Sequence, residues 1–241
     1  MVSSYKVWSE SGSDWIDAVS VKKRSGAAFD TIYESFSPIE LVGYQTYTNS
    51  TLTIPDTADL TGLTQAGDLI IYSGSEDGDA MTQPPPAGFT LITQGAVGVS
   101  YQLSYKFATS SSEVITNVPS TGDSEAHLFS IFRNVNQGNP FHQSVVVSTG
   151  ATGVPDPSSL TSTIDNTVFV VFGFLDDDLV ASTTNPPTDF TLIGAEEGTK
   201  SGSTVAAAYK ALPAPTTVDP GIFSSTGDDQ WVAASLILNP E

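Results

Sequence analysis

The sequence predicts an all-β fold: a jelly-roll-like β-sandwich with an internal duplication, preceded by a small N-terminal segment of β-hairpins. Three observations predict it. Short apolar runs rich in β-branched and aromatic residues recur along the chain, and turn-forming residues bound each of them. No stretch combines a helical period with helix caps. Four of the apolar blocks return in the same order about a hundred residues later.

The duplication is clearest in one phrase, PPAGFTLI at residues 85–92, which returns as PPTDFTLI at residues 186–193. The blocks around it also repeat: GDLIIYSGSEDGD with NTVFVVFGFLDDD, YQLSYKFA with TVAAAYKAL, and STGDSEAHLFSIFRNV with STGDDQWVAASLILNP. The offsets are about 99, 101, 104 and 105 residues, a drift that small loop insertions produce. We therefore expect a sandwich body at 35–241, with halves at about 60–150 and 160–241 related by an approximate twofold axis.

Each repeated block is predicted to form one strand. LIIY and VFVVF are continuous apolar runs, as expected of central strands buried on both faces. FTLI follows prolines, which are tolerated only at the beginning or the edge of a strand. YQLSYKFA alternates with a period of two, which is typical of a half-buried strand. AHLFSIF and WVAASLIL suit an inner strand or a helix, and their small residues favour a strand.

The first 34 residues contain a second, shorter repeat. VWSESGSDWIDA at 7–18 is echoed by VKKRSGAAFDTI at 21–32, and Trp15 matches Phe29. Each copy predicts a strand, a glycine turn and another strand, which together form a hairpin. Because two isolated hairpins cannot bury their aromatic residues, we expect this segment, at 1–34, to pack against something larger.

Composition excludes several functional classes. The 241 residues carry a net charge of −19, from 27 acidic and 8 basic residues, which argues against nucleic-acid binding. No apolar run approaches the roughly 20 residues that span a bilayer, and the first residues lack the apolar core of a signal peptide. We therefore expect no membrane insertion. The chain has no cysteine, so it has no disulfide and no thiolate nucleophile.

The basic residues are unevenly distributed. Half of them lie within the first 24 positions, whereas the chain from Ser35 onward has 22 acidic and 4 basic residues. Segment 1–34 alone can therefore approach an acidic partner without strong repulsion. We expect this segment to dock the protein onto a larger assembly. The candidate docking residues are its aromatic and clustered basic side chains: Trp8, Trp15, Phe29, Lys22, Lys23 and Arg24.

The sequence contains no catalytic motif. Its only histidines are His127, in an apolar run, and His142, in a loop. A Ser-His-Asp triad needs an imidazole held by a carboxylate beside an exposed serine. We expect His127 to be an inward or edge residue of a strand, and His142 to lie at the surface. There is no G-x-S-x-G elbow, H-E-x-x-H pair or Walker loop. The sequence thus predicts a protein without enzymatic activity.

Acidic clusters are the candidate metal ligands. Closely spaced carboxylates are hard oxygen ligands that suit Ca²⁺, although the spacing here does not match an EF-hand loop. The alternative, which we favour, is that these residues form solvated turns of an acidic surface. We expect no other cofactor. The clusters follow two matching strands and comprise Glu76, Asp77 and Asp79 in one half and Asp176, Asp177 and Asp178 in the other.

A platform of exposed aromatic residues for sugars is a further alternative. Tyr44, Tyr47 and Tyr101 are its candidates, whereas Trp231 lies inside a predicted strand and is expected in the core.

The order of the motifs resembles a β-sandwich repeat of proteins encoded by tailed bacteriophages and prophages. In the second copy, Asp165-Asn166 stands where Gly-Asp is usual, and Thr188-Asp189 where Ala-Gly is usual. The N-terminal KVWSESGSDWIDA is similar to the short V-W-x-G-S-x-W-V repeats that often precede such domains in phage virion proteins. The matching residues of the first copy are GDLI at 67–70, PPAGFTL at 85–91, YKFA at 105–108, RNV at 133–135 and NP at 139–140.

The resemblance implies a non-enzymatic virion protein and brings no catalytic residues with it. The implied role is a tail, neck or fibre-type appendage, made in the host cytoplasm, with its N-terminus docked and its acidic sandwich projecting outward. Its partners would be other virion proteins and further copies of the chain, with a trimer favoured by analogy. A capsid decoration or cement protein, and a carbohydrate-binding module that attaches to a host-surface glycan, remain the alternatives.

Overall fold

The computed structural model describes residues 5–8, 15–25, 28–34, 37–48, 57–77, 83–120, 124–176, 184–198, 202–224 and 229–241. In the first three of these ranges only the backbone is described. The regular elements in all of these ranges are β-strands, so the predicted all-β class is confirmed. Accordingly, the described residues include no helix that could cross a membrane.

The chain divides into two compact units, one of residues 1–38 with Glu241 and one of residues 39–240. The small unit is a three-stranded antiparallel sheet of β1 (Tyr5–Trp8), β2 (Trp15–Ser25) and β3 (Ala28–Glu34). Strand β2 pairs with both of its neighbours. The two hairpins expected from the sequence therefore share one continuous strand.

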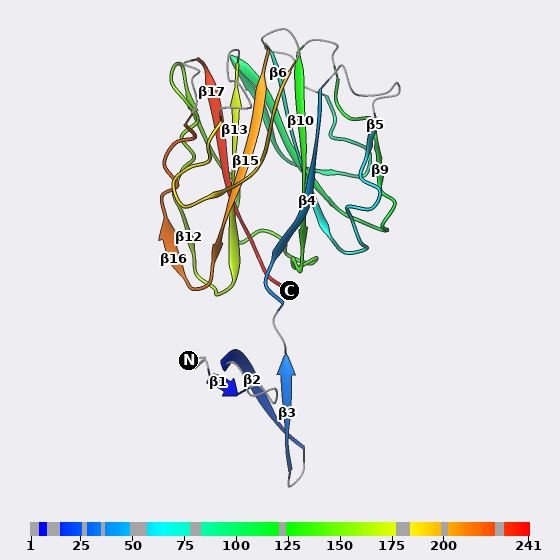
Figure 1. Ribbon diagram of the computed structural model, residues 1–241, viewed down its shortest axis with the longest axis vertical. Coiled ribbons are helices and arrows are strands. Elements are labelled where there is room, and N and C mark those ends of the chain that lie inside the picture. The colour runs from blue at the N-terminus through cyan, green and yellow to red at the C-terminus, as the bar shows by residue number, and fades with distance from the viewer. Residues whose placement is uncertain are drawn as a thin grey trace. The chain divides into compact units, whose positions relative to one another are not determined.

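The large unit contains two five-stranded antiparallel sheets (Figure 1). In sheet order, the first comprises β4 (Glu40–Thr48), β10 (Glu125–Arg133), β6 (Leu69–Asp77), β8 (Val99–Phe107) and β7 (Thr90–Val97). The second comprises β11 (Val146–Gly150), β17 (Trp231–Leu238), β13 (Thr167–Leu175), β15 (Thr204–Leu212) and β14 (Thr191–Glu197). The predicted β-sandwich is confirmed. Jelly-roll connectivity is not, because residues 40–133 supply all strands of one sheet and residues 146–238 all strands of the other.

The two sheets repeat the same arrangement. Strands β6 and β13 lie at the centres, and the strands on either side of them correspond in sequence order. Both sheets also shift register at an equivalent point, between Leu91 and Thr93 in the first and between Leu192 and Gly194 in the second. The matched orders and the matched irregularity are what the repeated sequence blocks predict.

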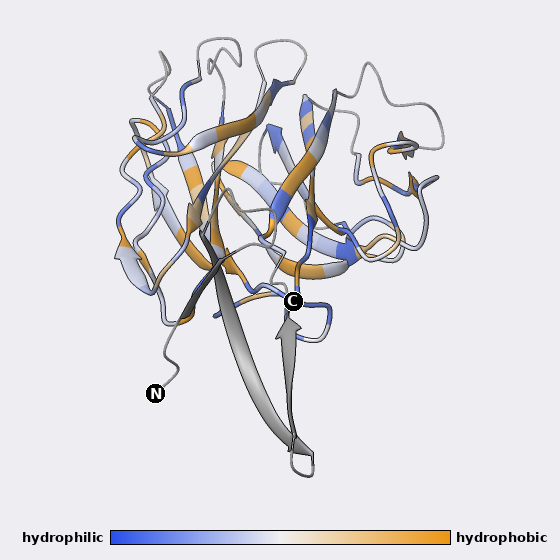
Figure 2. Cartoon of the chain, turned by 60° about the horizontal axis from the view of Figure 1, so that its bottom comes forward, coloured by the Kyte–Doolittle hydropathy of each residue, from blue (hydrophilic) through white to orange (hydrophobic). Residues whose placement is uncertain are grey.

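Both faces of the central strands of each large sheet are covered. Between the sheets, residues such as Ile71, Leu128 and Phe172 form one hydrophobic core. The outer face of the first sheet packs against the two-stranded sheet of β5 (Thr57–Asp59) and β9 (Val114–Thr116), and that of the second against β12 (Leu160–Ser162) and β16 (Thr216–Val218). These small sheets flank the sandwich on opposite sides in Figure 1, and Figure 2 shows hydrophobic segments along its strands. Two-sided burial explains why LIIY and VFVVF are continuous apolar runs.

The doubled phrase is a tight turn. The Phe89 N–H donates to the Pro86 carbonyl at 3.0 Å, and the same bond recurs in the second copy. The third residue of each turn has positive φ, 81° at Gly88 and 65° at Asp189. Positive φ at this position is typical of a type II turn, which favours glycine and tolerates Asn or Asp. The repeated phrase therefore has a structural role, as a turn that precedes a strand.

The other motif residues of the first half also hold the fold together. Arg133 donates to both carboxylate oxygens of Asp68 at 2.9 Å, and Asp68 also accepts the Gln65 N–H at 2.7 Å. Lys106 donates to Glu113 at 2.7 Å. The Lys106 ammonium also lies 5.9 Å from the ring centre of Phe89, within range of a cation–π contact. The motifs that carry the phage resemblance therefore mark structural contacts.

The strand registers correct one correspondence drawn from the sequence. Lys106 lies opposite Ile70 and Lys210 opposite Phe169, which aligns β6 with β13. Asn166 therefore takes the place of Gly67, and both have positive φ, 58° and 94°. The match of Asp165-Asn166 with Gly67-Asp68 that the sequence motifs suggest is therefore wrong by one residue. Asn can stand in the place of this Gly because it also tolerates the left-handed backbone conformation.

The turn geometry gives a first prediction. Gly88→Ala should lower the free energy of unfolding by about 1–2 kcal/mol, because a Cβ is strained at positive φ. Gly88→Asp should cost less, as Asp tolerates this conformation in the second copy. Urea denaturation would measure both. Thr188→Ala, one position earlier in the second turn, is the control and should change stability by less than about 0.5 kcal/mol. Equal effects of all three substitutions would contradict the assignment.

The Lys106–Glu113 pair gives a second prediction. Burial raises the pKa of Glu113, but hydrogen bonds from Lys106 and Thr109 outweigh it and leave the pKa below its usual value. The stability that this carboxylate supplies is thus present above the ordinary Glu pKa and is lost as pH falls through the lowered one. At neutral pH, Glu113→Gln should destabilise the fold by about 1–3 kcal/mol.

Urea denaturation across the acidic range tests this sign. The difference between wild type and Glu113→Gln should shrink as the pH falls. The matched control is Asp189→Asn, because Asp189 is exposed and lies 3.6 Å from Lys210, the counterpart of Lys106. That change should cost less than about 0.5 kcal/mol. A difference that stays constant with pH would show that Glu113 acts by packing alone.

Candidate functional site

The predicted docking residues lie in the small three-stranded sheet. Trp8 ends β1 directly opposite Trp15, the first residue of β2. Arg24, the last of the three consecutive basic residues of β2, is opposite Phe29 of β3. The backbone therefore brings aromatic and basic positions onto neighbouring strands of one small unit. Their side chains are outside the described part of the structure.

The described members of the two acidic clusters do not all lie in solvated turns. Strand β6 continues through Asp77, so Glu76 is a buried strand residue, only 1% exposed, and not part of a solvated turn. Asp77 and Asp176 are half-buried, and their backbone N–H groups donate to Ser124 and Gln230. Among the described residues no group of three or more acidic or histidine side chains is placed to hold a metal ion. The remaining candidates, Asp79, Asp177 and Asp178, lie outside the described ranges.

Glu76 instead belongs to a buried polar cluster on the outer face of the first sheet, which we call the Tyr72–His127 cluster. The Tyr72 hydroxyl lies 3.0 Å from Nδ1 of His127, and the two rings stack with centres 6.0 Å apart. Nε2 of His127 lies 3.5 Å from a carboxylate oxygen of Glu125. Glu125 is opposite Glu76 in the register of β10 and β6. All four side chains are essentially inaccessible to solvent.

This cluster has no equivalent in the second half. The registers of β13 and β17 place apolar residues at the four corresponding positions: Val171 for Tyr72, Leu175 for Glu76, Trp231 for Glu125 and Ala233 for His127. The duplicated fold therefore forms without the polar groups. They are a feature acquired or kept by one half alone.

The side chains of this cluster contact one another and are closed off from solvent. Burial raises the pKa of Tyr72 well above its ordinary value, and the nearby charges of Glu125 and Glu76 raise it further. The phenol is therefore neutral at physiological pH and holds the imidazole by a hydrogen bond. Because these side chains are fully covered, no substrate from solvent reaches them in this structure.

Sequence analysis placed His127 in a strand correctly but missed its partners. The available signal was the Glu-x-His spacing of residues 125 and 127, which puts both side chains on one face of a strand. The contact with Tyr72 spans 55 residues and depends on strand pairing. No local pattern reveals it.

The three tyrosines of the alternative sugar platform do not come together. Tyr101 is buried between the sheets against Phe174, with ring centres 5.4 Å apart. The Tyr47 hydroxyl donates to the Asp59 carbonyl at 2.9 Å on the outer face of the first sheet. Tyr44 is exposed, so the three rings share no surface. Trp231, expected in the core, is half-buried, and its indole N–H donates to the Thr152 carbonyl at 3.0 Å.

The Tyr72–His127 cluster gives a third prediction. Tyr72→Phe should cost about 1–3 kcal/mol at neutral pH, because it leaves a buried imidazole nitrogen without its partner. Tyr47→Phe is the matched control, since Tyr47 is only half-buried and water can replace its hydroxyl. It should cost less than about 1 kcal/mol. Urea denaturation measures both variants.

The alkaline range provides an independent check. A raised pKa means that the folded state holds the phenol proton more tightly, so stability falls once pH exceeds the ordinary tyrosine value of about 10. The difference between wild type and Tyr72→Phe should therefore narrow above that pH. A difference unchanged with pH would contradict a buried, neutral Tyr72.

Comparisons with known proteins return no match: no family model, no curated protein and no solved structure is similar to this chain.

Proposed function

We propose that this protein is a non-enzymatic structural component of a bacteriophage virion. In this proposal it is a tail, neck or fibre-type appendage that docks through residues 1–34 and presents its acidic sandwich outward. One observation carries the proposal. Each Lys or Arg of the sandwich that the structure describes already lies within 4 Å of a carboxylate of the same chain: Lys106 with Glu113, Arg133 with Asp68 and Lys210 with Asp189.

This pairing leaves the sandwich without free positive charge in its described part. From Ser35 onward 22 acidic residues face 4 basic ones, so most carboxylates have no basic neighbour to balance them. Two such surfaces repel at distances up to the Debye length of about 8 Å. Attractive contact with an acidic assembly must then come from elsewhere on the chain.

The small unit supplies the missing charge. Half of the basic residues of the chain lie within its first 24 positions, and three of them, Lys22, Lys23 and Arg24, are consecutive in β2. Aromatic positions lie on the same three strands. A compact unit of this composition suits repeated weak contacts that many copies on a particle reinforce. We expect the assembled form to be a symmetric homo-oligomer, with a trimer favoured by analogy.

The motif contacts support a structural role. In the resembling phage proteins the repeat is a sandwich without catalytic residues, and here the shared residues serve turns and ion pairs. A capsid decoration protein satisfies the same charge argument, and its position on the particle distinguishes it from an appendage.

Assembly experiments test the docking assignment. In the full chain, joint replacement of Lys22, Lys23 and Arg24 by Glu, and separately Trp15→Ala, should each reduce incorporation into particles at least about 10-fold, because they remove charge attraction or aromatic contact. The truncated chain 35–241 should stay soluble but fail to join particles. Sedimentation with immunodetection, followed by electron microscopy, measures incorporation and position.

The control is Lys210→Glu, which reverses a charge on the sandwich that pairs with the exposed Asp189. It should leave incorporation unchanged. Normal assembly of the truncated chain would place the contact surface on the sandwich and refute the docking role of residues 1–34.

A further inference from the structure

The sandwich is closed along one side and open along the other. On the closed side the edge strands β4 and β14 pack together, and the Tyr44 ring lies so close to Gly194 that a Cβ there would come within 2.8 Å of it. The matched strand orders make β11 and β7 the counterparts of β4 and β14. No comparable packing joins β7 to β11. A cleft of about 560 Å³ lies there instead.

Residue size explains the difference between the two sides. Val146 of β11 lies opposite Ser235 of β17, so the preceding residue, Val145, lies opposite Leu236. In the first sheet Tyr44 lies opposite Ser130, and Ser130 of β10 is equivalent to Leu236 of β17. Tyr44 and Val145 are therefore counterparts. The closed side thus holds a tyrosine ring over a glycine, whereas the open side has a valine. The smaller side chain leaves the space unfilled.

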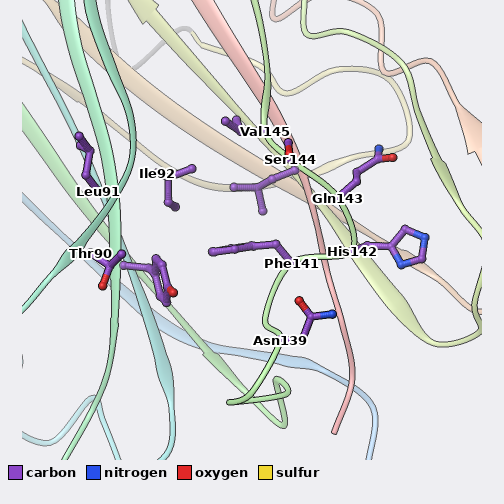
Figure 3. A pocket seen from close by; sticks show the side chains of 11 residues that line it. Thr90, Leu91, Ile92, Asn139, Phe141, His142, Gln143, Ser144 and Val145 are labelled. Carbon is purple, nitrogen blue, oxygen red and sulfur yellow. The ribbon is translucent and has the colours of Figure 1, made fainter.

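Aromatic and aliphatic side chains form the inner walls of the cleft. The rings of Tyr105 and Phe141 stand perpendicular, at 88°, with centres 4.9 Å apart, and both are half-buried. Figure 3 shows Phe141 pointing from its loop toward Thr90 and Ile92 of β7. Leu91 lies at the rim and is 41% exposed. Both aromatic side chains therefore line the cleft and give this corner an apolar wall.

Uncharged polar groups complete the lining. The side-chain amides of Asn139 and Gln143 and the hydroxyls of Thr90 and Ser144 make no hydrogen bond with any residue that the structure describes. They are therefore available as both donors and acceptors. No Asp, Glu, Lys or Arg lines the cleft, although the chain carries a net charge of −19.

His142 lines the cleft but is held by its own chain. Its Nε2 accepts the backbone N–H of Thr163 at 3.1 Å, so Nδ1 carries the proton and donates to the Asn239 side chain at 3.2 Å. His142 is half-buried, and it points away from β7 in Figure 3.

We propose that this cleft binds a neutral sugar unit, an uncharged pyranose of a polysaccharide. Perpendicular aromatic rings pack against the C–H face of a pyranose, and free amides and hydroxyls pair with its hydroxyl groups. The acidic body repels anions, and the cleft has no carboxylate to receive a cation. Its volume falls within the usual 300–1,000 Å³ of ligand pockets. The inference is independent of how the protein docks.

A direct test uses the full-length protein on an array of neutral and acidic oligosaccharides, followed by calorimetric titration of the neutral oligosaccharide that binds best. Gln143→Ala should weaken binding about 10-fold, the loss of about 1.4 kcal/mol. Gln65→Ala, an exposed glutamine away from the cleft, should leave affinity unchanged and serves as the matched control.

A second variant closes the cleft by copying the other side of the sandwich. Thr93 follows the register shift of β7 as Gly194 follows that of β14. Thr93→Gly combined with Val145→Tyr therefore places a tyrosine over a glycine, as Tyr44 and Gly194 do, and should abolish binding while the protein stays folded.

Absence of binding to any neutral sugar at millimolar concentration would overturn the proposal. So would sugar binding that survives the double variant. Dimerisation in ultracentrifugation that the double variant abolishes would assign the cleft to a second copy of the chain and also overturn it. Replacement of Lys22, Lys23 and Arg24 should leave sugar binding intact, which separates this test from the docking experiment.

Discussion

The need to bury both faces of β6 and β13 governs the rest of this structure. Each of these central strands is almost wholly inaccessible, so a single pair of stacked sheets would leave one apolar face of each in water. The two-stranded sheets β5–β9 and β12–β16 cover those faces. Burial of a large aliphatic or aromatic side chain contributes about 1.5–3 kcal/mol, and residues such as Phe129 and Phe169 gain it only because these outer layers are present. The result is four layers enclosing three hydrophobic cores.

The interest of a duplicated fold lies where its halves differ. The first half has a buried network of Tyr72, His127 and Glu125 where the second has only apolar side chains. One side of the sandwich is sealed by Tyr44, and the opposite side has a neutral cleft beside Val145. Both differences arise from a few substitutions at equivalent positions of the two sheets. Neither disturbs the hydrophobic layers.

Much of the fold could be predicted from the sequence, because apolar runs, period-two alternation and proline-marked turns are local signals. The equivalence of LIIY and VFVVF needed only the repeated order of blocks. The site could not be predicted in the same way. Glu76 looks like a loop residue until β6 is seen to continue past it, and His127 meets Tyr72 only through strand pairing. The cleft is open because Val145 stands where the other side of the sandwich has Tyr44, and the segments around these two residues have no visible sequence similarity. Likewise, the backbone register alone shows that the two N-terminal hairpins share β2.

Because each half builds a complete sheet with its own outer layer, only the face between the sheets needs the other half. A polypeptide comprising a single half would hide that face by pairing with an identical molecule, and such a dimer would have two identical lateral edges. Any substitution would then alter both edges at once. Joining the halves in one gene removes this restriction, so that one edge can serve cohesion while the other is free to diversify.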